Sequence, residues 1–375
     1  MATLIFGGAF DPPHCEHINL VKAAIKQLDI DKVVVVPTFL PPHKGEGFLS
    51  FEDRCQLIKL AFCDINAEIC IDNIEVEEQN DNYTYRILPK LKEKYGDIIF
   101  LLGGDSLEYF SSWKNPQEIV KCCPIAVAGR SGYNKIADVA DNLKAQFGGE
   151  FILIDYVGKD VSSAIIKAKL LMDKEVCELP KAVANYIHQN ALFCDYKDKV
   201  KKLRCIQSPA LFEHSVSVVL SAVDLNSKHN LKQDFRKVFL AALLHDNAKE
   251  RLSLDGISVP ADSIESPVLH QFLGAEKAKR DFNIADIEIL DAIRYHTTAK
   301  ADMTMLQKLI YTADSLSADR TYDPIPQLRK IAAVDFERGF KSVLRYTYLK
   351  VTAKGKGIYP LTEAAKCFYL DKNNI

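Results

Sequence analysis

Histidines and acidic residues gather in two parts of the sequence, and the first group follows a pair of glycines. It reads Gly7-Gly8-Ala9-Phe10-Asp11-Pro12-Pro13-His14-Cys15-Glu16-His17 and leads into an amphipathic stretch. Glycines let the backbone turn tightly, and a helix N-terminus offers free N–H groups to a phosphate. His14 and His17 are three residues apart, so they fall on one face of the helix start. The segment predicts a phosphate-binding turn with two imidazoles, although it is neither a Walker A loop nor a G-x-G-x-x-G fingerprint.

The second group is spread over the C-terminal half. His245-Asp246 follows the apolar run 239–244, and further histidines and one aspartate stand on other helical segments, namely His214, His270, His296 and Asp314. Imidazole and carboxylate form the ligand set of Fe, Mn or Zn in helical bundles. The pattern therefore indicates a metal site, and the alternative is a set of helix histidines whose hydrogen bonds are all satisfied internally.

The first half contains the elements expected to position the glycine and histidine turn. Short apolar runs, which are typical of strands buried on both faces of a parallel sheet, occur at 4–6, 33–36, 98–102, 125–128 and 151–154. Amphipathic stretches, such as 19–28 and 51–62, lie between them. The alternation predicts an α/β doubly wound, Rossmann-like domain with its ligand beyond the C-terminal ends of the strands.

The second half has a different pattern. Helical periodicity covers 236–245, 286–296 and 305–316, and runs rich in β-branched residues are almost missing from this half. A charged stretch at 195–202 separates the two patterns. We therefore expect two domains, an α/β domain over 1–195 and an all-α domain over 196–375.

Composition limits the classes of function. The 375 residues are 48% hydrophobic and 26% charged, with a formal net charge of −2. Such a chain is typical of a soluble globular protein, and its charge does not favour nucleic acid as a partner. The start, 1–8, does not resemble a signal peptide, and no apolar run is long enough to span a membrane. The ten cysteines form no C-x-x-C pair. We expect a cytoplasmic protein, and a homo-oligomer is compatible with the sequence.

The turn closely resembles the nucleotidyltransferase superfamily signature Gly-x-Phe-Asp-Pro-x-His-x-x-His. Over about 195 residues the order of motifs is similar to that of bacterial nicotinate-nucleotide adenylyltransferase: 37–44, Asn82-Tyr83-Thr84, Gly103-Gly104-Asp105, Trp113, Arg130 and 161–167. The resemblance implies transfer of AMP from ATP, with Mg²⁺, to nicotinate mononucleotide. It also implies the site residues. His14 and His17 would act on the α-phosphate, and nucleotide or substrate would be bound by Gly8, Phe10, Lys44, Thr84, Gly104, Asp105, Trp113, Arg130, Ser162, Ser163 and Lys167.

Two positions depart from the family pattern. Glu16 stands where glycine is expected, and a carboxylate beside the phosphate site would repel ATP unless it points away or helps to bind a metal. Ala164 and Lys167 replace the threonine and arginine of the late motif, and lysine lacks the bidentate fork of arginine. Two alternatives follow: the transferase uses another mononucleotide, or this half is a nucleotide-binding regulatory module.

The second group resembles the HD-domain phosphohydrolase superfamily, and within it the YqeK-type branch, over about residues 198–370. The segments that carry the resemblance are 242–249, 293–298 and 310–314. The branch cleaves diadenosine tetraphosphate symmetrically to two ADP. The resemblance implies two divalent metals, with iron expected and manganese or cobalt as alternatives. His214, His245, Asp246 and Asp314 would hold one metal and His270 and His296 the other, with Asp246 bridging. Lys249, Thr297 and Arg320 would reach the substrate, and Asp246 and Lys249 would be catalytic. Thr298 and Ala299 stand where the branch often has glycine.

Overall fold

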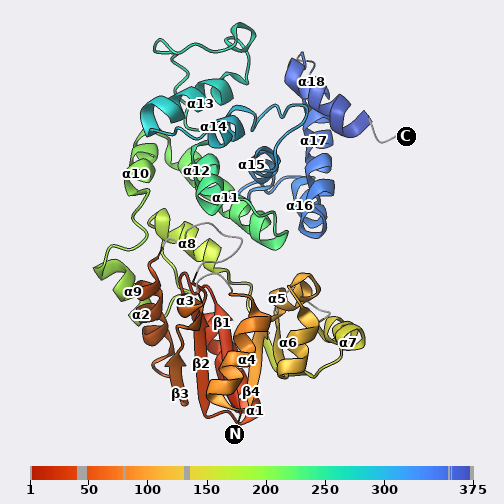
Figure 1. Ribbon diagram of the computed structural model, residues 1–375. Coiled ribbons are helices and arrows are strands. Elements are labelled where there is room, and N and C mark those ends of the chain that lie inside the picture. The colour runs from red at the N-terminus through yellow and green to blue at the C-terminus, as the bar shows by residue number, and fades with distance from the viewer. Residues whose placement is uncertain are drawn as a thin grey trace. The chain divides into compact units, whose positions relative to one another are not determined.

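The computed structural model describes residues 2–39, 49–78, 82–130, 136–353, 355 and 357–371, apart from the side chains of Asp105 and Arg130. Contacts divide the chain into two compact units. One comprises 1–167 with 175–193, and the other comprises 168–174 with 194–375. The first is an α/β unit and the second is helical, as the sequence predicts (Figure 1).

The α/β unit is built on one sheet. Its six described strands are β1 (Thr3–Gly8), β2 (Lys32–Pro37), β3 (Glu68–Ile71), β4 (Ile98–Gly103), β5 (Ile125–Arg130) and β6 (Phe151–Gly158). They are all parallel and lie in the order β3-β2-β1-β4-β5-β6. This is the doubly wound order, in which the chain reverses direction across the sheet between β1 and β4, and ligands bind beyond the strand ends at that point.

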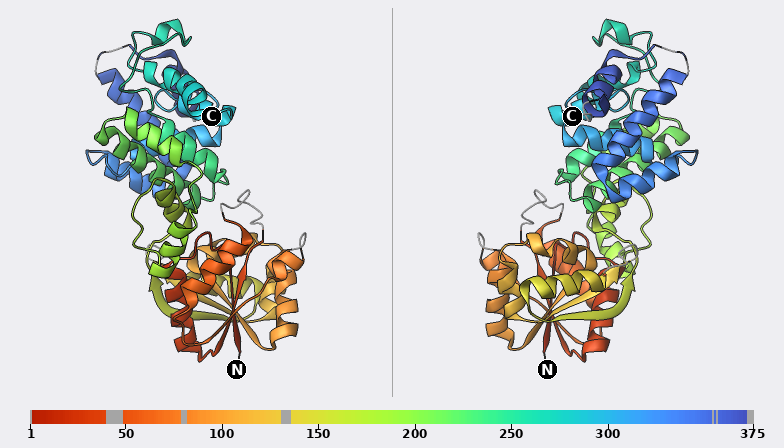
Figure 2. Two further views of the ribbon diagram at one scale, coloured as in Figure 1. Left: turned by 90° about the vertical axis from the view of Figure 1, so that its left-hand side faces the viewer. Right: turned by 90° about the vertical axis from the view of Figure 1, so that its right-hand side faces the viewer.

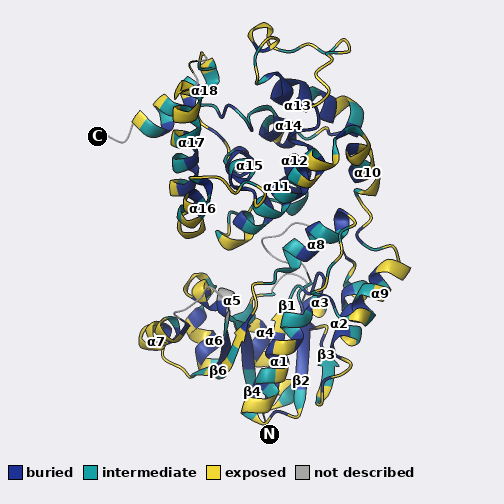
Figure 3. Ribbon diagram, turned by 180° about the vertical axis from the view of Figure 1, so that it is seen from behind, coloured by how far each residue is buried: buried dark blue, intermediate teal, exposed yellow. Residues whose placement is uncertain are grey.

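Helices lie on both faces of this sheet (Figure 2). The helices of this unit are α1 (Cys15–Leu28), α2 (Phe51–Phe62), α3 (Ile74–Glu77), α4 (Thr84–Tyr95), α5 (Gly104–Glu108), α6 (Pro116–Cys122), α7 (Ile136–Phe147) and α9 (Lys181–Gln189). A further helix, α8 (Ser163–Leu171), begins in this unit, and its last four residues belong to the other one. Alternate strand residues such as Ile5, Val34 and Phe100 form one core with apolar residues of α4, α6 and α7. β1, β2 and β4 are buried over most of their length (Figure 3), which explains their continuous apolar sequences.

The helical unit contains α10 (Lys197–Ile206), α11 (Pro209–Lys228), α12 (Phe235–Leu244), α13 (Leu269–Phe282), α14 (Ile287–Arg294), α15 (Met305–Leu316), α16 (Ile325–Val334), α17 (Phe336–Ala353) and α18 (Pro360–Lys366). Several begin at a side-chain cap. Asp234 accepts from the N–H of Lys237 at the start of α12, and Thr304 forms a capping box with Gln307 at the start of α15. α12 is buried from Val238 to Leu244, so the His245-Asp246 pair that follows it is carried into the centre of the unit.

In the part of the chain that the structure describes, no helix combines the length and apolar character that a membrane crossing requires.

Candidate functional sites

The histidine turn begins where β1 ends. Gly8 is the last residue of β1, and a Cβ there would lie 3.1 Å from the ring of Phe10, which is buried behind the turn. His14 precedes α1 and His17 lies in its first turn, with their rings stacked at a centroid distance of 3.8 Å. The structure thus brings both predicted histidines together at a helix N-terminus beside the end of β1.

The tautomer of His17 follows from one hydrogen bond. The backbone N–H of His14 donates to Nδ1 of His17 at 3.1 Å. An Nδ1 that accepts places the proton of a neutral imidazole on Nε2. Nε2 of His17 is therefore a donor, which is the role that an imidazole needs beside a phosphate oxygen.

The Glu16 carboxylate is bound to the end of β6. Its Oε2 accepts from the hydroxyl of Tyr156 at 2.7 Å and from the backbone N–H of Lys159 at 2.8 Å, and its Oε1 accepts from Asn19 at 3.2 Å. These donors offset the negative charge. Tyr156 and Lys159 are partners of the motif that sequence reasoning missed, because they lie about 140 residues further along the chain.

The start of α8 also meets the turn. The hydroxyl of Ser163 donates to the carbonyl of Pro12 at 3.1 Å, and the hydroxyl of Ser162 accepts from the N–H of Ala164 at 3.2 Å. Lys167 forms an ion pair with Asp11, with both side chains almost buried. The late motif therefore lies against the first one, and Lys167 contributes its charge to the turn itself.

The remaining predicted residues of this half lie at other ends of strands and helices. Gly104 begins α5 directly after β4, where a Cβ would lie 2.7 Å from Ile136. Thr84 begins α4, next to Tyr83, whose ring lies 4.1 Å from the ammonium of Lys114. Trp113 packs against Phe110 at a centroid distance of 5.4 Å. Lys44 and the side chains of Asp105 and Arg130 lie outside the described residues.

Two buried residues that sequence reasoning missed form hydrogen bonds with the backbone just after β1 and just after β2. Arg54 of α2 donates to the carbonyl of Ala9 at 2.8 Å, and Glu75 of α3 accepts from the N–H of Phe39 at 3.0 Å. Arg and Glu are residue types that are mostly exposed, so the sequence gave no signal that these two are buried and have this role.

In the helical unit, the predicted histidines and aspartates converge on Asp246, which is fully buried. His245 and His214 face its Oδ2 with Nε2 atoms at 3.3 and 3.8 Å. His270 and His296 face its Oδ1 at 3.6 and 3.4 Å. The carboxylate thus lies between two pairs of imidazoles, one pair at each oxygen.

Asp314 completes the side of the cluster that faces Oδ2. Its Oδ1 lies 3.1 Å from Nε2 of His214 and 3.9 Å from Nε2 of His245. Two sets could hold a metal among the described residues, His214 with His245 and Asp314, and His245 with Asp246 and His296. We refer to the six residues His214, His245, Asp246, His270, His296 and Asp314 as the HD cluster.

Hydrogen bonds behind the histidines turn their Nε2 atoms toward the cluster. Nδ1 of His245, His270 and His296 lies 2.7–2.9 Å from the carbonyl three residues earlier in each case. Nδ1 of His214 lies 2.8 Å from Oδ2 of Asp319, a residue that sequence reasoning missed. A partner of this kind fixes the ring orientation of a metal-ligating histidine.

Protonation in the HD cluster differs from one residue to the next. Burial disfavours charge on His245, but the facing Asp246 and Asp314 outweigh it and raise the pKa of this imidazole, so a metal bound there would displace a proton. Burial disfavours charge on Asp246, but the facing His245 and His296 outweigh it and hold the pKa of this carboxyl well below its usual range. Burial lowers the pKa of His270 to about 4, and the neighbouring His296 acts in the same direction. An ionised carboxylate and a neutral imidazole are the forms that bind divalent metals.

Two buried atoms at the centre of the cluster support the same reading. Among the described residues, Nε2 of His245 and Oδ1 of Asp246 find no hydrogen-bond partner. A buried polar atom without a partner costs about 1–3 kcal/mol, and coordination of a cation would satisfy both atoms. The donor set therefore fits a divalent metal.

The predicted substrate-binding residues of this half lie next to the HD cluster. Nζ of Lys249 is 2.6 Å from Oδ2 of Asp246, and the guanidinium of Arg320 is 2.6 Å from Oδ1 of Asp314. The hydroxyl of Thr297 lies 3.0 Å from Nε2 of both His270 and His296. All three are thus placed where they could contact a group bound at the cluster.

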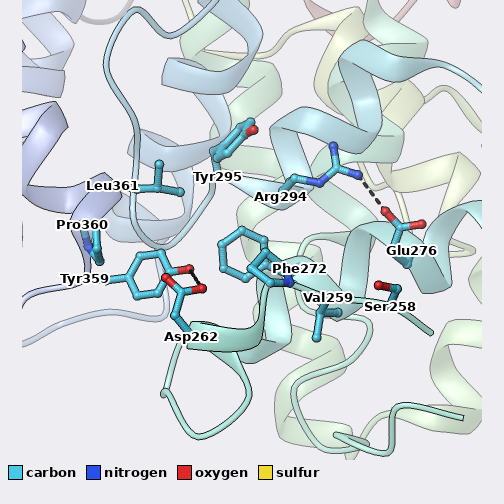
Figure 4. Close-up of a pocket in the computed structure, with 11 residues that line it drawn as sticks. Ser258, Val259, Asp262, Phe272, Glu276, Arg294, Tyr295, Tyr359, Pro360 and Leu361 are labelled. Carbon is cyan, nitrogen blue, oxygen red and sulfur yellow. Dashed lines mark hydrogen bonds and ion pairs between the residues drawn. The ribbon is translucent and has the colours of Figure 1, made fainter. Parts of the chain in front are cut away.

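A pocket of about 370 Å³ opens between α13, the end of α14 and the start of α18. Figure 4 shows its aromatic walls, Phe272, Tyr295 and Tyr359, and the ion pair between Arg294 and Glu276 at 2.8 Å. The residues predicted from sequence do not line this pocket, so it is separate from the HD cluster.

Comparison with known proteins gives two family matches. Residues 5–169 match the cytidylyltransferase-like family, and residues 211–319 match the HD domain. A Mycoplasma genitalium protein named "Probable nicotinate-nucleotide adenylyltransferase/Ap4A hydrolase" is 26% identical over 92% of this chain and 97% of its own length. A Clostridium acetobutylicum "Probable nicotinate-nucleotide adenylyltransferase" is 32% identical over 50% of this chain and 97% of its own length.

A solved structure, described as a "predicted HD superfamily hydrolase involved in NAD metabolism" from Clostridium acetobutylicum, aligns with a TM-score of 0.44 and 28% identity. The alignment covers 48% of this chain and 98% of that one. On its sequence relatives, the chain belongs to the nicotinate-nucleotide adenylyltransferase family, fused to an HD domain in its second half.

Proposed function

We propose that the chain is a bifunctional enzyme. Residues 1–195 transfer AMP from ATP to nicotinate mononucleotide, which gives nicotinate adenine dinucleotide and pyrophosphate. Residues 196–375 cleave diadenosine tetraphosphate to two ADP. Family membership supports both activities, and the observation that carries the proposal in each half is the arrangement of histidines, around the start of α1 in the first and around Asp246 in the second.

In the first half, donors surround the place where charge develops. Nε2 of His17 donates, the α1 N-terminus adds its dipole, and the stacked His14 stands beside them. These groups stabilise the α-phosphate as the mononucleotide attacks in line and pyrophosphate leaves. Mg²⁺ that enters with ATP would supply positive charge for the leaving pyrophosphate. Alignment and electrostatic stabilisation are enough for this chemistry, so a covalent intermediate is not needed.

The other residues of the first site are assigned the roles that the family resemblance implies. Ser162, Ser163 and Lys167 bind the triphosphate, which is consistent with the contacts of Ser163 and Lys167 to the turn. Thr84 and Trp113 face the pyridine ring. Gly8, Phe10 and Gly104 shape the nucleotide site, and Lys44, Asp105 and Arg130 contact nucleotide or substrate.

In the second half, the HD cluster holds two divalent metals. His214, His245 and Asp314 would hold one metal, His270 and His296 would hold the other, and Asp246 would contribute to both. Such a pair, with iron as the expected metal, would supply an activated water and positive charge for the phosphate oxygens. Lys249, Thr297 and Arg320 bind the tetraphosphate and orient it for attack. Because Lys249 and Arg320 contact cluster carboxylates in this structure, each would exchange that contact for a substrate phosphate.

The first activity is tested by pyrophosphate release from ATP in the presence of nicotinate mononucleotide. Release that depends on this mononucleotide supports the proposal. If pyrophosphate is released only with nicotinamide mononucleotide or another acceptor, this half is a transferase that acts on a different substrate. ATP binding by calorimetry without turnover would favour a regulatory module. The second activity is tested by hydrolysis of diadenosine tetraphosphate with Fe²⁺, Mn²⁺ or Co²⁺ supplied, for which we expect ADP as the product, and absence of hydrolysis would refute it. Metal analysis of the native protein should find two Fe, Mn or Co ions per chain.

A further inference from the structure

The loop that follows α15 contacts two members of the HD cluster at once. Oδ2 of Asp319 lies 2.8 Å from Nδ1 of His214. The neighbouring Arg320 donates to Oδ1 of Asp314 at 2.6 Å and to the carbonyl of Asp314 at 2.7 Å. His214 and Asp314 face each other at 3.1 Å. One short segment therefore contacts two of the three residues on the side of the cluster that faces Oδ2 of Asp246, His214 and Asp314, and does not contact the third, His245.

The other three histidines of the cluster do not depend on this loop. His245, His270 and His296 are each oriented by a backbone carbonyl three residues earlier, within their own turn. His214 is oriented by a carboxylate 105 residues away in sequence. A carboxylate behind an imidazole fixes its orientation and raises its basicity as a metal ligand.

The loop is itself firmly attached. Arg329 of α16 donates to the carbonyls of Leu316, Ser317 and Arg320. The N–H of Asp319 donates at 3.3 Å to the hydroxyl of Ser217, which lies on α11 one helical turn after His214. Asp319 is thus held against the helix that carries its partner, although its side chain is 41% exposed.

We propose that Asp319 is a positioning residue for one of two metals in the HD cluster. It holds His214 for the metal that His214, His245 and Asp314 share, whereas the metal at His270 and His296 does not depend on it. The inference rests on the proposed two-metal function of the cluster. Its consequence is selective: loss of the Asp319 carboxylate weakens one metal and leaves the other.

The experiment is a titration of metal-free full-length protein with Mn²⁺, followed by calorimetry and by electron paramagnetic resonance. For wild type we expect two Mn²⁺ per chain and the signal of a coupled pair. For Asp319→Ala we expect one Mn²⁺ at wild-type affinity and a second weakened about 10- to 100-fold, the range found for outer-shell partners of metal ligands. When one equivalent of Mn²⁺ has been added, the variant should then give the electron paramagnetic resonance signal of an isolated ion. Asp319→Asn keeps an acceptor oxygen without the charge, so its affinity for the second Mn²⁺ should fall by less than that of Asp319→Ala.

Asp224 supplies a matched control. It lies on α11 like His214, its side chain is 39% exposed, and it pairs with Lys228 rather than with the cluster. Asp224→Ala should bind both ions like wild type. Equal unfolding temperatures of the metal-free proteins show that the variants fold.

Two results would overturn the proposal: wild-type binding of both ions by Asp319→Ala, or equal weakening of both. A wild-type protein that binds fewer than two ions would overturn the two-metal function itself, and this inference with it. Because that result appears in the unmodified protein, the two failures are distinguishable.

Discussion

The hydroxyl of Tyr156 donates a hydrogen bond to the carboxylate of Glu16 at 2.7 Å, which ties the histidine turn to the end of β6. The N–H of Lys159 reaches the same oxygen at 2.8 Å. Lys159 leads directly to Ser162 and Ser163, which belong to the proposed triphosphate site. Glu16 therefore connects two parts of the proposed ATP site.

Replacing Glu16 with alanine should loosen this connection. We expect Glu16→Ala to raise the KM for ATP and to lower kcat/KM about tenfold, because a hydrogen bond to a charged group is worth roughly 1.5–3 kcal/mol and only part of it acts on the transition state. Glu16→Gln keeps an acceptor oxygen and should remain near wild type. Steady-state pyrophosphate release measures both variants.

Tyr156→Phe is the partner control for this prediction. It removes one donor, so it should act in the same direction as Glu16→Ala, and the double variant should be no worse than Glu16→Ala alone. A lower KM for ATP in Glu16→Ala would contradict the account, because it would mean that the carboxylate repels ATP.

The ion pair between Lys167 and Asp11 should stabilise the α/β unit. Their side chains are only 12% and 9% exposed. Removing one partner of a buried pair typically costs about 3–5 kcal/mol, so Lys167→Met should lower the free energy of unfolding by about 3 kcal/mol. Lys167→Arg keeps the charge, so its free energy of unfolding should fall much less. Urea unfolding followed by the fluorescence of Trp113, the single tryptophan, measures this unit, and an unchanged midpoint for Lys167→Met would refute the prediction.

Glu75 should make the stability of the α/β unit depend on pH. Burial raises the pKa of Glu75 from 4.5 to about 7, against the opposing N–H of Phe39 and charge of Arg54. Between pH 4.5 and 7 the folded protein keeps the proton while the unfolded chain loses it, so the free energy of unfolding falls as pH rises through this window. The loss is then complete above pH 7, and it amounts to on the order of 3 kcal/mol.

Glu75→Gln cannot ionise and isolates this effect. Its stability relative to wild type should be near zero at about pH 4.5 and should grow to on the order of 3 kcal/mol in favour of the variant above about pH 7. Urea unfolding at several pH values, again followed by Trp113, gives the difference. A difference that does not change with pH would show that Glu75 titrates normally.

His17 should matter for transfer and not for hydrolysis. His17→Ala removes one donor to the α-phosphate, and loss of such a donor costs about 10²- to 10³-fold in kcat. His17→Gln restores a side-chain N–H and should recover part of the rate. Hydrolysis of diadenosine tetraphosphate by either variant serves as the internal control, and a parallel loss of both activities would point to unfolding instead.

Much of the fold could be predicted from sequence because its signals are local. The strands predicted at 33–36 and 98–102 are buried on both faces and are apolar throughout. β3 was missed because Glu68–Ile71 is a short, partly exposed edge strand whose alternation is too brief to recognise. α2 and α15 have the predicted bounds.

The site was predicted less evenly. The spacing of the His14–His17 pair is visible in sequence, and resemblance supplied the six residues that converge as the HD cluster. Asp319 and Tyr156 could not be found, because each acts through a partner more than 100 residues away. Arg54 and Glu75 were missed because a charged residue on a short amphipathic helix usually faces water, whereas these two are buried.

A single substitution at Asp246 should separate the two proposed activities. Asp246→Asn removes the charge that faces all four histidines of the HD cluster. It should abolish metal binding and lower hydrolysis by more than the roughly 100-fold seen for outer-shell partners. Pyrophosphate release should remain at the wild-type rate, since the residue belongs to the helical unit.

The most direct measurement is the product analysis of one reaction that contains metal-loaded protein, ATP, nicotinate mononucleotide and diadenosine tetraphosphate. Anion-exchange chromatography should show nicotinate adenine dinucleotide with pyrophosphate, and ADP as the product of the tetraphosphate. Asp246→Asn should lose only the ADP. Absence of the dinucleotide, or cleavage of the tetraphosphate to AMP and ATP, would contradict the bifunctional account.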